Sequence, residues 1–278
     1  MQETERPVPG EKFRQGDILR FEGGDERRSY SRGVIINADC DLENNKLDGV
    51  IAYLPLYSFE EYLEHFWIKQ YVDQVKNNHL KWILDLCGLD SSSSSNQNDI
   101  VEWLSYSDSE SIATKLIAQH GLKSKELEAI KVRLDKLRHC VDPLGRSLTH
   151  FHVYCSWEKD PAAFALKQLI AAKNSMGDDH FFLSEVLGER EIGFVVRMRR
   201  IYTINVHQCF TSTSAQLTSS DGNSLSAVRI AKLTTLFQFK IAQIFALQYS
   251  RIGLPNEMTA LNNLVLDTLA VDLSKSKI

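Results

Sequence analysis

The sequence predicts a mixed α+β protein with β structure toward both ends and helices between. Runs with strand character lie before residue 57 and again in the last third of the chain, whereas apolar residues in the middle recur every three or four positions. With 43% hydrophobic and 24% charged residues, the composition indicates a folded globular protein and excludes collagen-like, disordered and coiled-coil classes. At roughly 150 residues per domain, a chain of 278 residues is expected to form two domains or one domain with a large insertion.

Charge and motifs narrow the functional classes. The net charge of -4 argues against a surface that attracts nucleic acid or anionic lipid everywhere. The polar first residues do not form a secretory signal, and no apolar run is long enough to span a membrane. Five widely spaced cysteines predict reduced thiols. No Gly-rich phosphate loop, Walker motif or HExxH motif is present, so no cofactor is predicted. The lack of a secretory signal and of a membrane segment predicts a cytoplasmic protein.

Three strands are predicted in the N-terminal part. Gly16–Phe21 alternates between apolar and polar residues, and Gly33–Asn37 is a β-branched run typical of a buried strand. The third strand, Val50–Leu56, contains Pro55, which lacks a backbone donor and is expected to end regular pairing.

The triplet Asp39-Cys40-Asp41 follows the second strand, at a position from which side chains often face a cleft. Two flanking carboxylates raise the pKa of a thiol, which argues against a nucleophilic cysteine. We therefore expect the aspartates to cap the turn and Cys40 to be a small buried side chain.

Helices are predicted from Ser58 onward, because Ser58-Phe59-Glu60-Glu61 has the form of a capping box. Gly88 is expected to end the first helix, and the serine-rich residues 91–98 have nothing to bury, which predicts a flexible loop. Further helices are predicted over Ser109–His120, Ser124–His139 and Asp160–Lys173.

The last part of the chain mixes both kinds of element. Strands are predicted over Leu148–Cys155, Phe181–Leu183 and the long cationic run Ile192–Ile204. Thr211–Asn223 is predicted to be a loop. The strongest helical pattern of the chain covers Ser224–Ser250, and Glu257–Leu273 predicts a last amphipathic helix.

The order of strands and several segments resemble the MazF/PemK-like endoribonuclease toxins, which have an SH3-like small β-barrel. The segments are Gly16-Asp17-Ile18, Arg32–Asp39, Ile51–Leu56, Gly193–Ile204 and Arg229–Leu233, the last resembling the entry to the final helix of the family. The resemblance implies a PemK-like barrel built from residues 1–57 and 177–278, with long C-terminal helices. Residues 58–176 would then be a mainly helical insertion.

In that family an arginine that opens the second strand and a threonine or serine that closes the third carry RNA cleavage. The arginine position falls on Arg32, whose guanidinium can stabilise charge on a phosphate. The threonine position falls on Tyr57, with Ser58 next to it, and Gly33 replaces the usual proline. These departures, and the role of Ser58 as a helix cap, predict a degenerate site.

The leading functional prediction is therefore a non-catalytic MazF/PemK-like binding or regulatory component. The large helical insertion would supply a surface for a protein partner, and a homodimer is compatible with the sequence. Basic and aromatic residues also predict a platform for single-stranded RNA or DNA or for an acidic partner, formed by Arg27, Arg28, Arg197, Arg199 and Tyr202. The wider pattern resembles uncharacterised bacterial proteins of multi-gene stress and antiphage-defence loci.

Two other functions stay open at this point. One is an active, metal-independent endoribonuclease that uses Arg32 with Ser58 or Tyr57. The other is a helix-turn-helix DNA-binding regulator over residues 109–138, although the mixed charge of its second helix is more typical of a solvated face.

A zinc site is not predicted. The cluster of metal-capable side chains in the sequence comprises His139, Cys140, His150, His152 and Cys155. On the predicted strand, His150 and His152 would share one face and Cys155 would lie on the other, so that the ligands would not converge.

Overall fold

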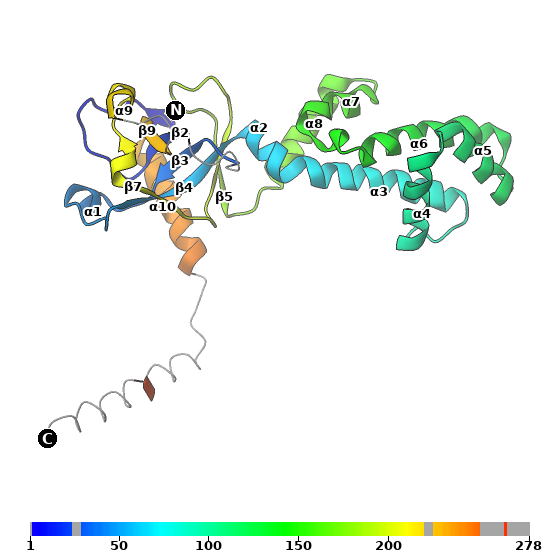
Figure 1. Ribbon diagram of the computed structural model, residues 1–278, viewed down its shortest axis with the longest axis horizontal. Coiled ribbons are helices and arrows are strands. Elements are labelled where there is room, and N and C mark those ends of the chain that lie inside the picture. Colours follow the sequence, from blue (N-terminus) through cyan, green and yellow to red (C-terminus); the bar gives the residue numbers. More distant parts are fainter. Residues whose placement is uncertain (1, 24–28, 220–224, 251–263, 266–278) are drawn as a thin grey trace.

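The computed structural model describes residues 2–23, 29–219, 225–250 and 264–265. Figure 1 shows a curled sheet on one side of the molecule and an arm of helices that extends away from it. The fold is mixed α+β, as predicted. The strands come from residues 4–58 and 180–233, and the helices between them build the arm.

The N-terminal strands and the late strands join in one sheet, which curls into a half-barrel. The N-terminal strands are β1 (Thr4–Glu5), β2 (Asp17–Glu22), β3 (Arg32–Ile35) and β4 (Val50–Ser58). The late strands are β5 (His180–Leu183), β6 (Phe194–Arg197), β7 (Tyr202–Asn205), β8 (Cys209–Phe210) and β9 (Ser226–Leu233). Their order is β1-β9-β2-β3-β4-β6-β5, with β7 beside β4 and β8 beside β9. Every pair is antiparallel except that of β8 with β9.

Both faces of the sheet are buried by apolar side chains. One face carries a ring cluster in which Tyr53 contacts Phe21 and Tyr202, with centroids 4.7 and 5.9 Å apart. The other face carries Ile18, Leu54 and further aliphatic residues, and it packs against α10 (Thr235–Ser250). Alternate residues of each strand therefore serve two different cores.

Strand β4 continues through Pro55, where the sequence predicted an end. The N–H and C=O of Ala52 both face β3, so the backbone of Pro55, three residues on, faces the opposite edge. On that edge β6 pairs with residues 56–58 and β7 with residues 50–53, which leaves Pro55 in the gap between them. No ladder bond is lost. The same gap divides the long strand predicted over 192–204 into two.

The arm contains the helices α2 (Phe59–Tyr62), α3 (Ile68–Leu86), α4 (Ser94–Tyr106), α5 (Ser109–His120), α6 (Leu127–Val141), α7 (Phe151–Ser156) and α8 (Pro161–Asn174). A π-helical turn over Leu63–Trp67 joins α2 to α3. The predicted capping box is confirmed: Ser58 Oγ accepts a hydrogen bond from Glu61 N, and Glu61 Oε2 accepts one from Ser58 N. Gly121 ends α5 in the left-handed conformation, with φ of 62°.

Two sequence predictions are wrong within the arm. The serine-rich residues 91–98 are not a loop throughout, because Ser93 caps α4 and the burial of Ile100 and Leu104 anchors the helix that follows. The strand predicted over Leu148–Cys155 is a 3₁₀ turn followed by α7. There Phe151 and Tyr154 follow helical spacing and pack on α3 and α6 side chains, and Cys155 is buried, which outweighs their β propensity.

The helix predicted over Ser224–Ser250 is a strand followed by a helix. Residues 226–233 form β9, and α10 begins only at Thr235. Pairing with β2 buries Ala227, Val228 and Ala231, so an apolar run that also fits a helix is held as a strand between two others. The predicted loop 211–223 contains α9 (Thr213–Ser219). The predicted helix Glu257–Leu273 lies outside the described residues except for 264 and 265.

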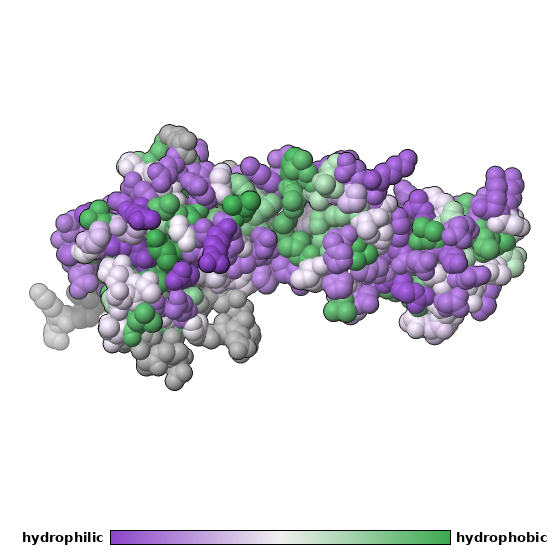
Figure 2. Space-filling view, turned by 90° about the horizontal axis from the view of Figure 1, so that it is seen from above, coloured by the Kyte–Doolittle hydropathy of each residue, from purple (hydrophilic) through white to green (hydrophobic). Residues whose placement is uncertain are grey.

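The arm carries exposed apolar side chains near the sheet. Seen from above, hydrophobic residues gather on the part of the arm that adjoins the sheet (Figure 2). In α8, Leu166 and Ile170 are each more than half exposed, and Ala172 is the buried residue of that helix. Among the described residues, no helix combines the length and the apolar composition needed to cross a membrane.

Candidate binding groove and its arginine–glutamate cluster

The site begins with two arginines that lie directly opposite each other on neighbouring strands. Arg20 of β2 pairs with Arg32 of β3, and like charges in such a pair repel. Glu189, from the loop between β5 and β6, lies between them: its Oε2 accepts from Arg32 Nη2, and its Oε1 is 3.7 Å from Arg20 Nη1. The carboxylate of Glu189 therefore bridges the two arginines, and Glu22 pairs with Arg20 as well.

Both terminal nitrogens of the Arg32 guanidinium donate hydrogen bonds inside the protein, whereas its buried Nε has no partner among the described residues. Besides Glu189, the guanidinium donates to Glu191 Oε1 at 2.8 Å and to Ser31 Oγ at 2.8 Å, and it lies 5.3 Å from the centre of the Phe194 ring. The residue is only 4% exposed. Burial opposes the charge, but the hydrogen bonds that Arg32 donates to Glu189 and Glu191 outweigh it and raise the pKa of Arg32. A phosphate would have to displace these carboxylates.

The other two predicted catalytic residues are also occupied. Ser58 is buried and its hydroxyl caps α2, as described above. Tyr57 is buried in the ring cluster on the face opposite to the one that holds Phe194, and its hydroxyl lies 3.4 Å from Ser29 Oγ. Glu61 links the cap to the cluster, with its Oε2 3.9 Å from Arg32 Nη1. The structure thus brings Ser58 near Arg32 and places Tyr57 on the other side of the sheet.

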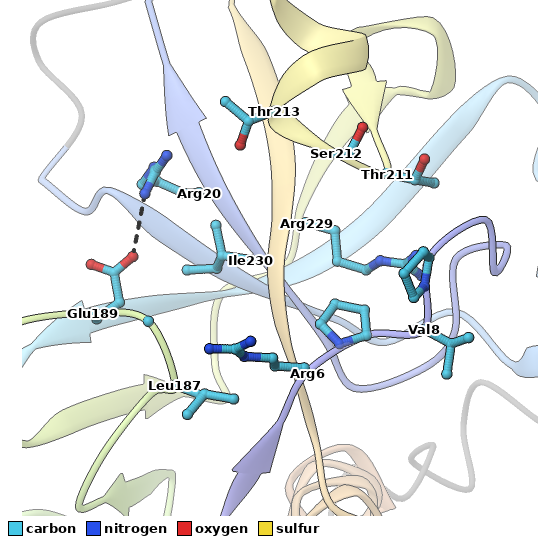
Figure 3. A pocket seen from close by; sticks show the side chains of 13 residues that line it. Arg6, Val8, Arg20, Leu187, Glu189, Thr211, Ser212, Thr213, Arg229 and Ile230 are labelled. Atoms are coloured by element: carbon cyan, nitrogen blue, oxygen red, sulfur yellow. Dashed lines mark ion pairs between the residues drawn. The ribbon is translucent and has the colours of Figure 1, made fainter.

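Next to this cluster lies an open groove of about 420 Å³. Its walls are the N-terminal segment 6–9, the loop 187–189 and residues 211–213 before and in α9, and Ile230 of β9 forms part of its floor (Figure 3). Arg6 and Arg20 lie on the same side of the groove as Glu189, whereas Thr211 and Ser212 lie on the other. The groove thus combines cations, hydroxyls and an apolar floor.

A β-bulge sets the floor of the groove. Ile18 of β2 pairs with Ala231 and Leu19 pairs with Arg229, so that Ile230 is an extra residue in β9. The side chain of Arg229 lies on the face of the sheet opposite to that of Ile230, where it forms a buried ion pair with Asp17, with Nη1 3.0 Å from Oδ2. Burial raises the pKa of Asp17 to about 6, although the hydrogen bond from the Arg14 backbone and the charge of Arg229 lower it.

The residues predicted to form a nucleic-acid platform are engaged separately. Arg197 lies over the ring of Phe66 at 4.1 Å, and Arg199 pairs with Asp179 at 3.0 Å while staying largely exposed. Tyr202 packs in the ring cluster next to Tyr30 and Tyr53. Arg27 and Arg28 lie outside the described residues.

The triplet Asp39-Cys40-Asp41 lies in a short helix, α1 (Asp39–Glu43), immediately after the second predicted strand. Asp39 Oδ1 accepts a hydrogen bond from the backbone N–H of Gln15 at 2.7 Å, so it fixes the segment that precedes β2. Cys40 is exposed, and the expectation that it is a buried side chain is wrong, because the helix turns it toward solvent.

The metal-capable residues of the arm do not converge. The rings of His139 and His150 have centroids 6.0 Å apart, and those of His150 and His152 are 6.2 Å apart. Cys140 and Cys155 are buried in the helical core. Across the part of the chain that the structure describes, no group of three or more such side chains could hold a metal ion.

The helix pair α5 and α6 uses its basic residues internally. Ile130, Leu134 and Leu137 of α6 are fully buried in the arm core. Arg138 donates to backbone carbonyls of the α4 end, and Lys131 pairs with Glu110 at 3.2 Å. This arrangement does not favour α6 as a recognition helix, which has to present its face to DNA.

Comparisons with known protein families, with curated proteins and with solved structures found no significant match.

Sequence reasoning missed Glu189, Glu191, Arg6 and Arg20. Arg20 carried a weak signal, since it follows the strand alternation of β2 at a position that faces away from Leu19 and Phe21. The glutamates carried none, because they lie in a loop 157 and 159 residues from Arg32 and contact it only in the folded chain.

Proposed function

We propose that this protein is a non-catalytic binding component, related by its strand order to the MazF/PemK-like barrels. The observation that carries the proposal is the burial of Arg32 and the pairing of its Nη2 with Glu189 and Glu191, which a phosphate would have to displace. Ser58 and Tyr57 are occupied as well. The arginine that the resemblance implies is thus present, but its contacts do not suit the RNA cleavage that the resemblance implies for it. The resemblance favours a role in a bacterial multi-protein stress or antiphage-defence system.

The groove beside this cluster favours an acidic segment of a protein partner. Arg6 forms no ion pair within the described residues and presents its charge to the groove. Arg20 also lines the groove and is partly exposed, although it pairs with Glu22 and Glu189. Hydroxyls at Thr211 and Ser212 supply further hydrogen bonds. The lining contains prolines and aliphatic side chains and no aromatic ring, whereas proteins that bind single-stranded nucleic acid stack its bases on aromatic rings.

The test is to incubate the purified protein with two labelled probes, a single-stranded RNA and a peptide rich in Glu and Leu. We expect retention of the peptide and no cleavage of the RNA by the wild-type protein or by Arg32→Ala. Arg6→Ala and Arg20→Ala should each weaken peptide binding by about three- to tenfold, the usual effect of one partly exposed charge. Lys125→Ala, which removes an exposed charge from the arm, is the matched control.

Three results would contradict the proposal. RNA cleavage that Arg32→Ala abolishes would establish a nuclease. Retention of RNA but not of the peptide, with the same dependence on Arg6 and Arg20, would replace the protein partner by a nucleic acid. Binding to duplex DNA at low salt that fails in Lys131→Ala would support the DNA-regulator alternative instead.

A further inference from the structure

A second pocket lies in the arm, away from the sheet and from the groove. It is formed where α3, α6, α7 and α8 meet, and it has a volume of about 290 Å³. This is close to the lower end of the range for small-molecule sites, about 300 to 1,000 Å³. The function proposed above does not use this pocket.

Aromatic rings form much of its wall. Tyr154 is buried at the base, and its ring centroid is 4.8 Å from that of Trp157 and 5.6 Å from that of Tyr71. Tyr154 thus packs edge to face against both other rings, which restricts its motion. Phe164 of α8 also lines the pocket, and it belongs to none of the hydrophobic clusters of the arm. Its half-buried ring is available to a ligand.

Three amide side chains lie around the same pocket. Gln74 and Asn78 come from successive turns of α3, and Gln168 comes from α8, one turn after Phe164. Within the described residues, none of the three forms a hydrogen bond with another protein group. Each amide offers both donors and an acceptor. Amides from two helices around one pocket suit a flat ligand whose edge carries donors and acceptors.

The pocket is close to electrically neutral. Lys136 and Glu158 both line it and carry opposite charges. His79 lines it too, and Arg133 lies 3.3 Å from its Nδ1; an arginine only donates, so Nδ1 accepts and the ring proton is assigned to Nε2. Burial, with the nearby charges of Arg133 and Lys136, lowers the pKa of His79 to about 4. The histidine is therefore uncharged at neutral pH.

We propose that this pocket binds a nucleobase. A base is flat and uncharged, stacks on aromatic side chains and is read by the amides of Asn and Gln, which pair with its donor and acceptor edge. The rings, the three amides and the neutral imidazole match each of these properties. Because the pocket has no excess of positive charge, the base and not the phosphate supplies the binding energy.

The experiment measures binding of adenosine, guanosine, cytidine and uridine to the full chain by calorimetry, with ribose as the sugar without a base. We expect at least one nucleoside to bind and ribose not to bind. The 5′-monophosphate of that nucleoside should bind with an affinity within about threefold of the nucleoside's own. This difference is less than the change that one charge-assisted hydrogen bond produces. Tighter binding of a short single-stranded RNA would indicate that the base belongs to a polymer.

Two neighbouring asparagines of α3 give a matched pair of variants. Asn78 lines the pocket, whereas Asn77 does not, and both side chains are exposed. Asn78→Ala should weaken nucleoside binding by about tenfold, a typical value for a base-reading amide, and Asn77→Ala should leave it unchanged. Neither side chain forms an internal hydrogen bond, so both variants should fold, which thermal melting checks.

Failure of all four nucleosides to bind at millimolar concentration would overturn the proposal. So would equal binding of ribose, or equal loss in Asn77→Ala and Asn78→Ala. These outcomes are independent of the sheet groove, whose test uses a peptide and Arg6 and Arg20.

Discussion

The sheet and the arm bury different kinds of side chains. Among the described residues, the buried polar and charged side chains lie in or beside the sheet, apart from Ser109 in the arm. The sheet holds buried charges as pairs, such as Asp17 with Arg229, whereas the arm buries apolar side chains, with an aliphatic cluster around residues such as Leu134 and an aromatic cluster around Tyr154. The comparison shows that one chain can be stabilised in two ways. Separating a buried charge pair should destabilise the sheet, whereas creating a cavity should destabilise the arm.

The largest effect is expected from separating a buried charge pair. Arg229→Ala leaves Asp17, which is fully buried, without its partner, and the loss of one member of such a pair costs about 3 to 5 kcal/mol. Arg229 also donates to the carbonyls of Glu11 and Lys12, so the N-terminal segment should loosen from the sheet. Urea unfolding measures the change, and a loss below about 1 kcal/mol would show that the pair is not a main support of the sheet.

In the arm, the corresponding change creates a cavity. Leu134→Ala removes a fully buried side chain from the α6 face that packs on α3 and α5 and should destabilise the arm by about 2 to 4 kcal/mol. Hydrogen exchange of the arm amides measures it locally, with Val132→Ala at an exposed position of the same helix as the control. Equal exchange in the two variants would contradict the description of this core.

The two parts should respond to acid in opposite directions. In the folded protein the pKa of His79 is about 4, against an ordinary 6.5. As the pH falls from 7 to 5, the unfolded state therefore takes up the proton first, and the free energy of unfolding of the arm falls by about 2 kcal/mol. In the folded protein the pKa of Asp17 is about 6, against an ordinary 3.8. The folded state therefore takes up the proton first, and the free energy of unfolding of the sheet rises by about 1 kcal/mol over the same pH interval. Hydrogen exchange at the two pH values separates these effects. His79→Gln should abolish the first change and leave the second.

The smallest effect is expected at the rim of the arginine cluster. Glu191 is partly exposed, and Arg32 keeps Glu189 when Glu191→Gln removes the charge. The loss of stability should stay below about 1 kcal/mol, the value typical of an exposed ion pair. Unfolding curves measure it, and we expect this variant not to cleave RNA. Cleavage by Glu191→Gln would show that this carboxylate alone holds a nuclease in check.

The sequence predictions were correct where the signal lies within a few residues and wrong where the structure depends on residues far apart in the chain. The capping box at Ser58 and the helix end at Gly121 were predicted correctly, because their signals lie within four residues. The element over 226–233 was assigned to a helix, because its apolar run fits both periods and only β2 beside it decides in favour of a strand. In the site, Arg32 could be singled out but its partners could not.

By itself, the sequence determined the α+β class, the helix caps and the buried strands β2 and β3, since composition and local periodicity act along the chain. Tertiary structure decided the rest. It placed Pro55 in the gap between β6 and β7, so that a proline fits inside a strand. It brought Glu189 and Glu191 to Arg32 and assembled the arm pocket from four helices. These arrangements depend on contacts between residues far apart in the chain, and their energies come from pairing and burial that no short segment contains.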